Sequence, residues 1–186
     1  HLQLSFQGAR PATTERIGFA VWQLQHLEGS AAVYLALVVH AKPGMGAAAG
    51  QKILDKLQTR TFGTTVGSLI KAAQLPLELR ERFEKIVESR NWLIHRSGLS
   101  NRNAVHNDRA CGELIARVNA LATESKLLHE ELRKLAEAFG LKHGISPQEV
   151  NERSRRLIME WRKGGGMSGN SVRSAITPHQ AACEYA

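Results

Sequence analysis

A heptad-like seam between residues 114 and 139 constrains the fold of this chain more than any other feature. The spacings along this seam are 4-3-4-3-4-3-4, carried by Leu114, Val118, Leu121, Ser125, Leu128, Leu132, Leu135 and Phe139. A repeat of this period is buried when a long helix packs against other helices. We expect one long helix here, capped at its start by Asn107 or Asp108 and terminated by Gly140.

The remaining periodic segments are also helical in spacing, and no strand pattern stands out. In chain order, Thr13 or Thr14 is expected to cap a first long helix, which ends at Lys42-Pro43-Gly44. A short helix over residues 51–59 is followed by the breaker Phe62-Gly63, and Thr64 or Thr65 caps another short helix. Gly98 ends a central helix, and the capping box Ser146-Pro147-Gln148-Glu149 begins a last one. The sequence therefore predicts an all-α fold, a helical bundle of about four to five helices with a long fourth helix.

The central helix, expected over residues 77–96, has one unusual position. Its apolar stripe is formed by Leu79, Phe83, Ile86, Val87, Leu93 and Ile94. At 100° per residue, Arg90 falls in the middle of that stripe. A buried guanidinium needs a partner, a wet cleft or a bound anion. Glu28 on the first helix is a candidate partner, but its position favours a solvent-facing side chain.

Two further polar residues flank the same stripe. Asn91 and His95 are four residues apart and therefore stack on one side of the helix. Arginine binds phosphate bidentately, and histidine transfers protons near neutral pH. A polar, basic loop carrying Arg96 and Arg102 follows directly. Arg90, Asn91 and His95 are thus candidate catalytic residues, and Arg96 and Arg102 are candidate substrate-binding residues.

The run Arg90-Asn91-Trp92-Leu93-Ile94-His95 resembles the Arg-x4-6-His motif of the HEPN superfamily (higher eukaryotes and prokaryotes nucleotide-binding domains), in particular small bacterial HEPN-like proteins. The resemblance covers roughly Thr13 to Trp161. A second match, Arg173/His179, lies in the tail without a helical context or an adjacent Asn. Short motifs of this kind recur by chance, so the context of the first match is what distinguishes it.

The resemblance implies a metal-independent endoribonuclease that acts on RNA as a homodimer, often as a toxin or phage-defence effector. Arg90 would stabilise the charged transition state, His95 would act as general acid or base, and Asn91 would orient His95 or contact the phosphate. An antitoxin or regulatory protein would be a further partner. In one toxin subfamily a Tyr that is modified by a nucleotidyltransferase stands where this chain has Ser97, so that mechanism does not carry over.

An alternative reading keeps the helical fold without catalysis. The chain would then be a dimerisation module or an RNA- or protein-interaction module. Arg90 would be a structural ion-pair partner, and His95 would be a residue whose cation favours the helix C-terminus.

Composition agrees with both readings. The net charge of +8 and pI of about 9.9 favour anionic partners such as RNA. The two cysteines and the scattered histidines show no metal-ligand spacing, so we expect no metal and no cofactor. No apolar run approaches the roughly 20 residues of a membrane span, and we expect a cytoplasmic protein without membrane contact.

The expected domain organisation has three parts. Residues 1–12 begin with His rather than Met and are expected to be a non-native or disordered N-terminus. Residues 13–163 form the helical domain, and residues 164–186, rich in Gly, Ser and Ala, form a flexible C-terminal tail.

Overall fold

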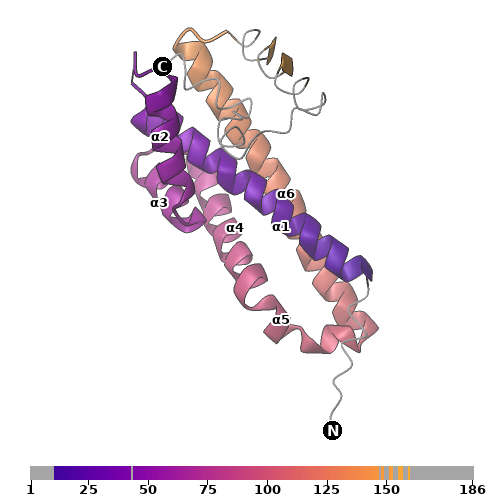
Figure 1. Cartoon of the computed structure of the whole chain (residues 1–186). Coiled ribbons are helices and arrows are strands. Elements are labelled where there is room, and N and C mark those ends of the chain that lie inside the picture. The colour runs from indigo at the N-terminus through magenta and orange to yellow at the C-terminus, as the bar shows by residue number, and fades with distance from the viewer. Residues whose placement is uncertain are drawn as a thin grey trace. The chain divides into compact units, whose positions relative to one another are not determined.

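The computed structural model describes residues 11–42, 44–146, 148, 151–152, 155–156 and 159 (Figure 1). Its elements are α1 (Pro11–Leu35), a π-helical turn η1 (Ala36–His40), α2 (Ala47–Gln58), α3 (Phe62–Lys71), α4 (Leu77–His95), α5 (Ser97–Ser100), a 3-10 turn η2 (Arg102–Val105) and α6 (Asp108–Lys142). These described residues contain no strand, which confirms the all-α prediction. The helix predicted from Ser146 and the tail 164–186 lie mostly or wholly outside the described residues.

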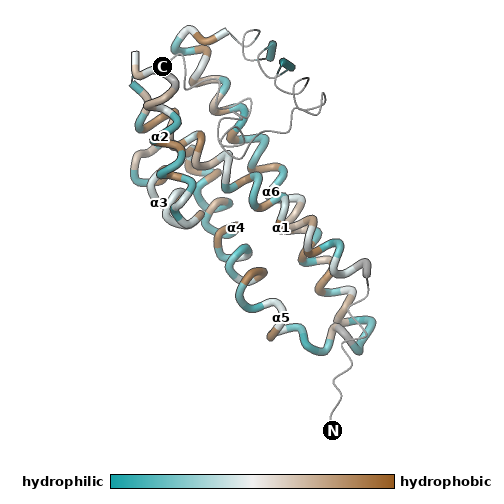
Figure 2. Tube along the Cα trace, viewed as in Figure 1, coloured by the Kyte–Doolittle hydropathy of each residue, from teal (hydrophilic) through white to brown (hydrophobic). Residues whose placement is uncertain are grey.

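The long seam is confirmed over most of its length. Leu114, Val118, Leu121, Ser125, Leu128 and Leu132 are buried, while Leu135 and Phe139 are half-buried. Figure 2 shows hydrophobic and hydrophilic residues alternating along α6, as expected for a helix with one buried face. The one polar member, Ser125, satisfies its buried hydroxyl by donating to the carbonyl oxygen of Leu121 at 2.8 Å.

The chain divides into two compact units, and α1 and α6 contribute to both. The first unit comprises His1–Glu28 and Pro76–His129, and the second comprises Gly29–Leu75 and Glu130–Ala186.

In the first unit, side-chain contacts link each pair of the three main helices. Arg90 of α4 contacts Glu28 of α1, and Arg82 of α4 contacts Glu124 of α6. The Thr13 hydroxyl of α1 lies 3.4 Å from the Cys111 sulfur of α6. Between these links the buried face of α4 supplies Leu79, Phe83, Ile86 and Leu93 to the core. The extent of the central helix was therefore predicted to within one residue, and four of its six predicted stripe residues are buried. Val87 is half-buried, and Ile94 is 45% exposed.

In the second unit, the end of α1 is buried on all sides. Every residue from 31 to 37 is buried, which is typical of a helix surrounded by other elements rather than lying on a surface. The Tyr34 hydroxyl donates to the carbonyl oxygen of Gln74 at 3.1 Å, joining α1 to the segment that follows α3. Burial raises the pKa of this phenol above its ordinary value.

Several predicted helix boundaries were wrong. Thr13 and Thr14 lie within α1, which begins at Pro11. Thr61, not Thr64 or Thr65, caps α3: its hydroxyl accepts a hydrogen bond from the Thr64 backbone N–H at 3.3 Å. Phe62 and Gly63 therefore begin α3 instead of breaking the chain. Gly98 lies within α5 and does not terminate α4, which ends at His95.

The end of α6 is set by Gly144 and not by Gly140. Gly144 has a φ of +79°, and its N–H donates to the Leu141 carbonyl oxygen at 3.1 Å. The Ile145 N–H donates to the Gly140 carbonyl oxygen at 2.9 Å. These two bonds form a Schellman motif, in which a left-handed residue closes the helix. Gly140 instead lies against the buried Ile145 side chain.

Candidate functional site

Arg90 projects from α4 toward α1, where it forms an ion pair with Glu28. Its Nε donates to Oε1 of Glu28 at 2.8 Å, and both side chains are 27% exposed. The expectation that Glu28 faces solvent was wrong. Glu28 borders the core stripe of α1, so its position in the sequence allows the side chain to face either solvent or the core. It faces Arg90, because a half-buried guanidinium requires a charged partner.

The neighbouring Asn91 contacts Arg90 and not His95. Nη1 of Arg90 donates to Oδ1 of Asn91 at 3.5 Å, the outer limit of a hydrogen bond. Asn91 is itself exposed. The arginine is therefore held on its Nε side by a carboxylate and contacted weakly by the amide beside it.

His95 is exposed at the last residue of α4. Its imidazole makes no hydrogen bond or ion pair within the part of the chain that the structure describes. Five residues separate His95 from Arg90, so the two side chains leave the helix about 140° apart. Within one chain they do not converge on a single small group.

The segment after His95 is more ordered than the polar loop that the sequence indicated. The Ser97 hydroxyl donates to the Leu93 carbonyl oxygen at 2.6 Å, and the Asn101 amide donates to the Ser97 carbonyl oxygen at 2.9 Å. Arg96, before α5, and Arg102, in η2, are both exposed. These bonds fix the backbone near both arginines and leave their side chains accessible.

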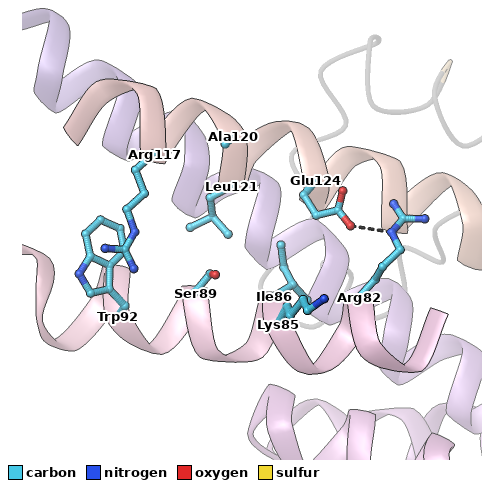
Figure 3. Close-up of a pocket in the computed structure, with 9 residues that line it drawn as sticks. All are labelled: Arg82, Lys85, Ile86, Ser89, Trp92, Arg117, Ala120, Leu121 and Glu124. Atoms are coloured by element: carbon cyan, nitrogen blue, oxygen red, sulfur yellow. Dashed lines mark hydrogen bonds and ion pairs between the residues drawn. The ribbon is translucent and has the colours of Figure 1, made fainter. Parts of the chain in front are cut away.

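In the first unit, a groove that the sequence did not indicate lies between α4 and α6 (Figure 3). It encloses about 270 Å³ and is lined by Arg82, Lys85, Ile86, Ser89, Trp92, Arg117, Ala120, Leu121 and Glu124. The lining residues recur at i, i+3, i+4 and i+7 on each helix, so each helix contributes one flank of its buried stripe.

The two ends of this α4–α6 groove are held by different interactions. At one end, Nε of Arg82 donates to Oε1 of Glu124 at 2.7 Å. At the other end, the Arg117 guanidinium carbon lies 3.4 Å from the centre of the Trp92 ring. Figure 3 shows these two contacts on either side of Ser89 and Leu121. Because Arg82 contacts Glu124 while Trp92 contacts Arg117, α4 and α6 run antiparallel along the groove.

Sequence reasoning missed the groove because no single helix contains it. Each lining position is an ordinary flank residue, and a charged residue there is usually solvated. The only local signal was the spacing of Lys85, Ser89 and Trp92, which share one side of α4. Recognising a groove also required the register of α4 against α6.

The described residues contain no group of three or more His, Cys, Asp or Glu side chains that could hold a metal ion. None of the helices described is long and apolar enough to span a bilayer.

Comparisons of the chain with protein-family models, with curated proteins and with solved structures find no match.

Proposed function

We propose that the protein is a metal-independent endoribonuclease of the HEPN type, active as a homodimer. The observation that carries this proposal is the end of α4, where Glu28 anchors a half-buried Arg90 and His95 stands exposed without a partner among the described residues.

Arg90 suits the role of a phosphate-binding group. Its Nε is engaged by Glu28, but its Nη2 makes no hydrogen bond within the described residues. A guanidinium fixed on one side offers its remaining N–H groups in a defined direction, so less side-chain entropy is lost when an anion binds. Glu28 is in this reading a positioning residue.

The chemistry uses the 2′-hydroxyl of the RNA as nucleophile. One His95 accepts the 2′-OH proton as the oxygen attacks phosphorus, the bond from phosphorus to the 5′-oxygen breaks, and a second histidine protonates that leaving oxygen. Arg90 stabilises the charge on the phosphorane-like transition state. The products end in a 2′,3′-cyclic phosphate and a 5′-hydroxyl.

A second copy of the chain supplies the second histidine. A second copy is also needed because Arg90 and His95 leave a single helix about 140° apart and cannot both reach one phosphate. Two α4 ends that face each other bring the Arg90 of one protomer near the His95 of the other. Light scattering during size-exclusion chromatography is expected to give a dimer at micromolar concentration.

The decisive experiment is cleavage of mixed cellular RNA in EDTA. Wild-type protein is expected to cleave and to leave cyclic-phosphate ends, while His95→Gln lowers the rate by roughly 10²- to 10⁴-fold. His106→Gln is the matched control, because His106 is also exposed and lies outside the site. Equal cleavage by wild type and His95→Gln, or no cleavage by a folded dimer, would refute the proposal.

The biological setting proposed is that of a toxin or phage-defence effector held in check by an antitoxin or regulatory protein. Expression of the wild-type chain is expected to slow the growth of a bacterial host, and His95→Gln to relieve the effect. Growth inhibition that persists in His95→Gln would separate toxicity from RNA cleavage.

The Glu28–Arg90 ion pair itself favours a second candidate, a non-catalytic dimerisation or interaction module. Arg90 then serves stability alone, since a half-buried cation without its carboxylate is costly. This candidate predicts that Arg90→Met lowers stability, and that RNA remains intact with both wild type and His95→Gln.

A further inference from the structure

The α4–α6 groove offers more hydrogen-bond donors than acceptors to a ligand. Its one carboxylate, Glu124, is engaged by Arg82. Arg117 forms no ion pair within the described residues. Nζ of Lys85 lies 3.9 Å from Oε2 of Glu81, which is a long ion-pair distance. The half-buried Ser89 hydroxyl forms no hydrogen bond within that same part of the chain. An ammonium, a guanidinium and a hydroxyl together select an acceptor-rich anion.

The stack of Arg117 on Trp92 adds a planar surface to this set. Arg117 is exposed, so the outer face of its guanidinium is open while the inner face covers the indole. A third planar group can extend such a stack, and stacking on an aromatic or guanidinium plane tolerates any nucleobase. The guanidinium edge remains available for a phosphate. A base and a phosphodiester therefore match the two kinds of surface that Arg117 presents.

The size of the groove suits a unit of a longer strand. Pockets that bury whole drug-sized ligands begin at roughly 300 Å³, and this groove of about 270 Å³ has two exposed cations, Lys85 and Arg117, in its lining. An apolar floor of Ile86 and Leu121 lies beneath the charged rim.

One basic residue, Arg96, continues the line of groove residues on α4 beyond the groove. Lys85, Ser89, Trp92 and Arg96 lie within about 60° of one another around α4. Lys85 and Arg96 are about 16 Å apart along the helix axis at 1.5 Å per residue. This line ends beside His95, the proposed proton-transfer group.

We propose that the α4–α6 groove binds single-stranded nucleic acid, with a base on the Arg117–Trp92 stack and phosphates on Lys85, Arg117 and Arg96. The choice of RNA as the natural strand rests on the proposed function. An acidic peptide would meet the same cations, but it has no aromatic ring for the stack at each unit. The groove thus guides a strand toward the end of α4.

The test separates binding from cleavage by using a fluorescently labelled single-stranded DNA, which lacks the 2′-hydroxyl and cannot be cut. Anisotropy of the full chain is followed at several salt concentrations. Arg117→Gln and Lys85→Gln are each expected to weaken binding and to lower the salt slope by about 0.7. Trp92→Leu is expected to weaken binding roughly 5- to 150-fold, and Trp92→Phe to retain most of it.

Arg109→Gln is the matched control. It removes the same charge from the same helix, but Arg109 lies outside the groove and its side chain is 90% exposed. Circular dichroism and thermal melting confirm that each variant is folded. Equal affinity of Arg117→Gln and Arg109→Gln for the DNA, or no binding by the wild-type chain, would overturn the proposal.

Two further outcomes separate the hypotheses. If polyglutamate of equal charge displaces the DNA and Trp92→Leu has no effect, the surface docks an acidic protein and the proposal is overturned. If the groove variants bind like wild type while RNA cleavage still depends on His95, the groove fails and the proposed activity stands. Groove-dependent DNA binding without RNA cleavage gives the reverse result.

Discussion

The Glu28–Arg90 ion pair is expected to stabilise the fold measurably, and a double-mutant cycle can quantify it. We choose Glu28→Leu, Arg90→Met and the double variant, because these side chains keep most of the volume and remove the charges. The matched control is the Arg109–Glu113 pair, which has a similar separation of 3.0 Å but side chains that are 90% and 67% exposed. The two pairs differ in their access to solvent, and also in that Arg109–Glu113 lies within one helix at i, i+4 whereas Glu28–Arg90 joins two helices.

The expected magnitude follows from that difference. Breaking a fully buried pair by removing one partner costs about 3–5 kcal/mol, whereas exposed pairs contribute about 0.2–1 kcal/mol. Glu28 and Arg90, at 27% exposed, lie between these limits. We expect about 1.5–2.5 kcal/mol for Glu28→Leu and a coupling energy of about 1–2 kcal/mol, since the bond is charge-assisted. The double variant should recover part of the loss, because it leaves no unpaired charge.

Urea denaturation provides the assay, with circular dichroism and tryptophan fluorescence followed together to check two-state behaviour. The control cycle on Arg109 and Glu113 should give a coupling energy below about 0.5 kcal/mol. If both cycles give the same small value, Arg90 is not held by Glu28 in solution. The positioning role assigned to Glu28 would then be withdrawn.

Three other substitutions test local features of the second unit. Gly140→Ala should leave stability unchanged or raise it by up to about 1 kcal/mol, because a Cβ there meets Ile145 no closer than 3.6 Å. Gly144→Ala should lower stability by about 1–2 kcal/mol, because the φ of Gly144 is +79°. Thermal melting of both variants tests this, and a Gly144→Ala protein more stable than Gly140→Ala would contradict the Schellman assignment. Tyr34→Phe should cost about 0.5–1.5 kcal/mol at neutral pH by removing the bond to Gln74. Burial raises the pKa of Tyr34 above 10.0, so the folded state holds the phenol proton more tightly than the unfolded state does. The contribution of Tyr34 to the free energy of unfolding is therefore intact below pH 10 and falls as the pH rises further. In urea titrations, the free energy of unfolding should decrease less between pH 9 and pH 11 for Tyr34→Phe than for wild type.

The long helix and its buried face were predictable because a single periodic pattern specified both. Seven-residue spacing places Leu114 and Leu128 on one side of a helix whatever they pack against. Leu135 and Phe139 continue the same pattern but are only half-buried. Periodicity therefore predicts which side of a helix faces its neighbours, and the extent of the neighbours decides how far burial continues.

Helix ends were harder to predict because several residues offered the same signal. Thr61, Thr64 and Thr65 are all good caps, and only the backbone at Thr61 is extended, with a ψ of 151°. Gly140 and Gly144 are both good terminators, and only Gly144 adopts a positive φ. A choice among equivalent residues depends on where the preceding helix packs, which local sequence does not contain.

In the candidate site too, features of a single helix were predictable, whereas features that depend on how two helices pack were not. Arg90 was placed on the buried stripe of α4 by periodicity, and the requirement for a partner followed from the cost of burying charge. The identity of that partner depends on how α1 lies against α4, across 62 positions of sequence. The α4–α6 groove depends on a similar register between Trp92 and Arg117.

The three faces of α4 carry different functional side chains. One face is buried and includes the side chain of Arg90, a second carries Lys85 and Trp92 along the groove, and the exposed remainder carries His95. A strand that follows the groove reaches Arg96, which is adjacent in sequence to His95, while Arg90 points toward α1 on another side. If the groove binds a strand as proposed, one copy of α4 would bring that strand near His95 without bringing Arg90 to the same phosphate. If RNA is cleaved, the arginine at the scissile phosphate must come from a second copy. Excess His95→Gln protein mixed with a fixed amount of wild type should then lower the activity, because each mixed dimer keeps only one of the two histidines. Excess Arg90→Met protein should leave the activity nearly unchanged, because that mixed dimer keeps both histidines and one Arg90.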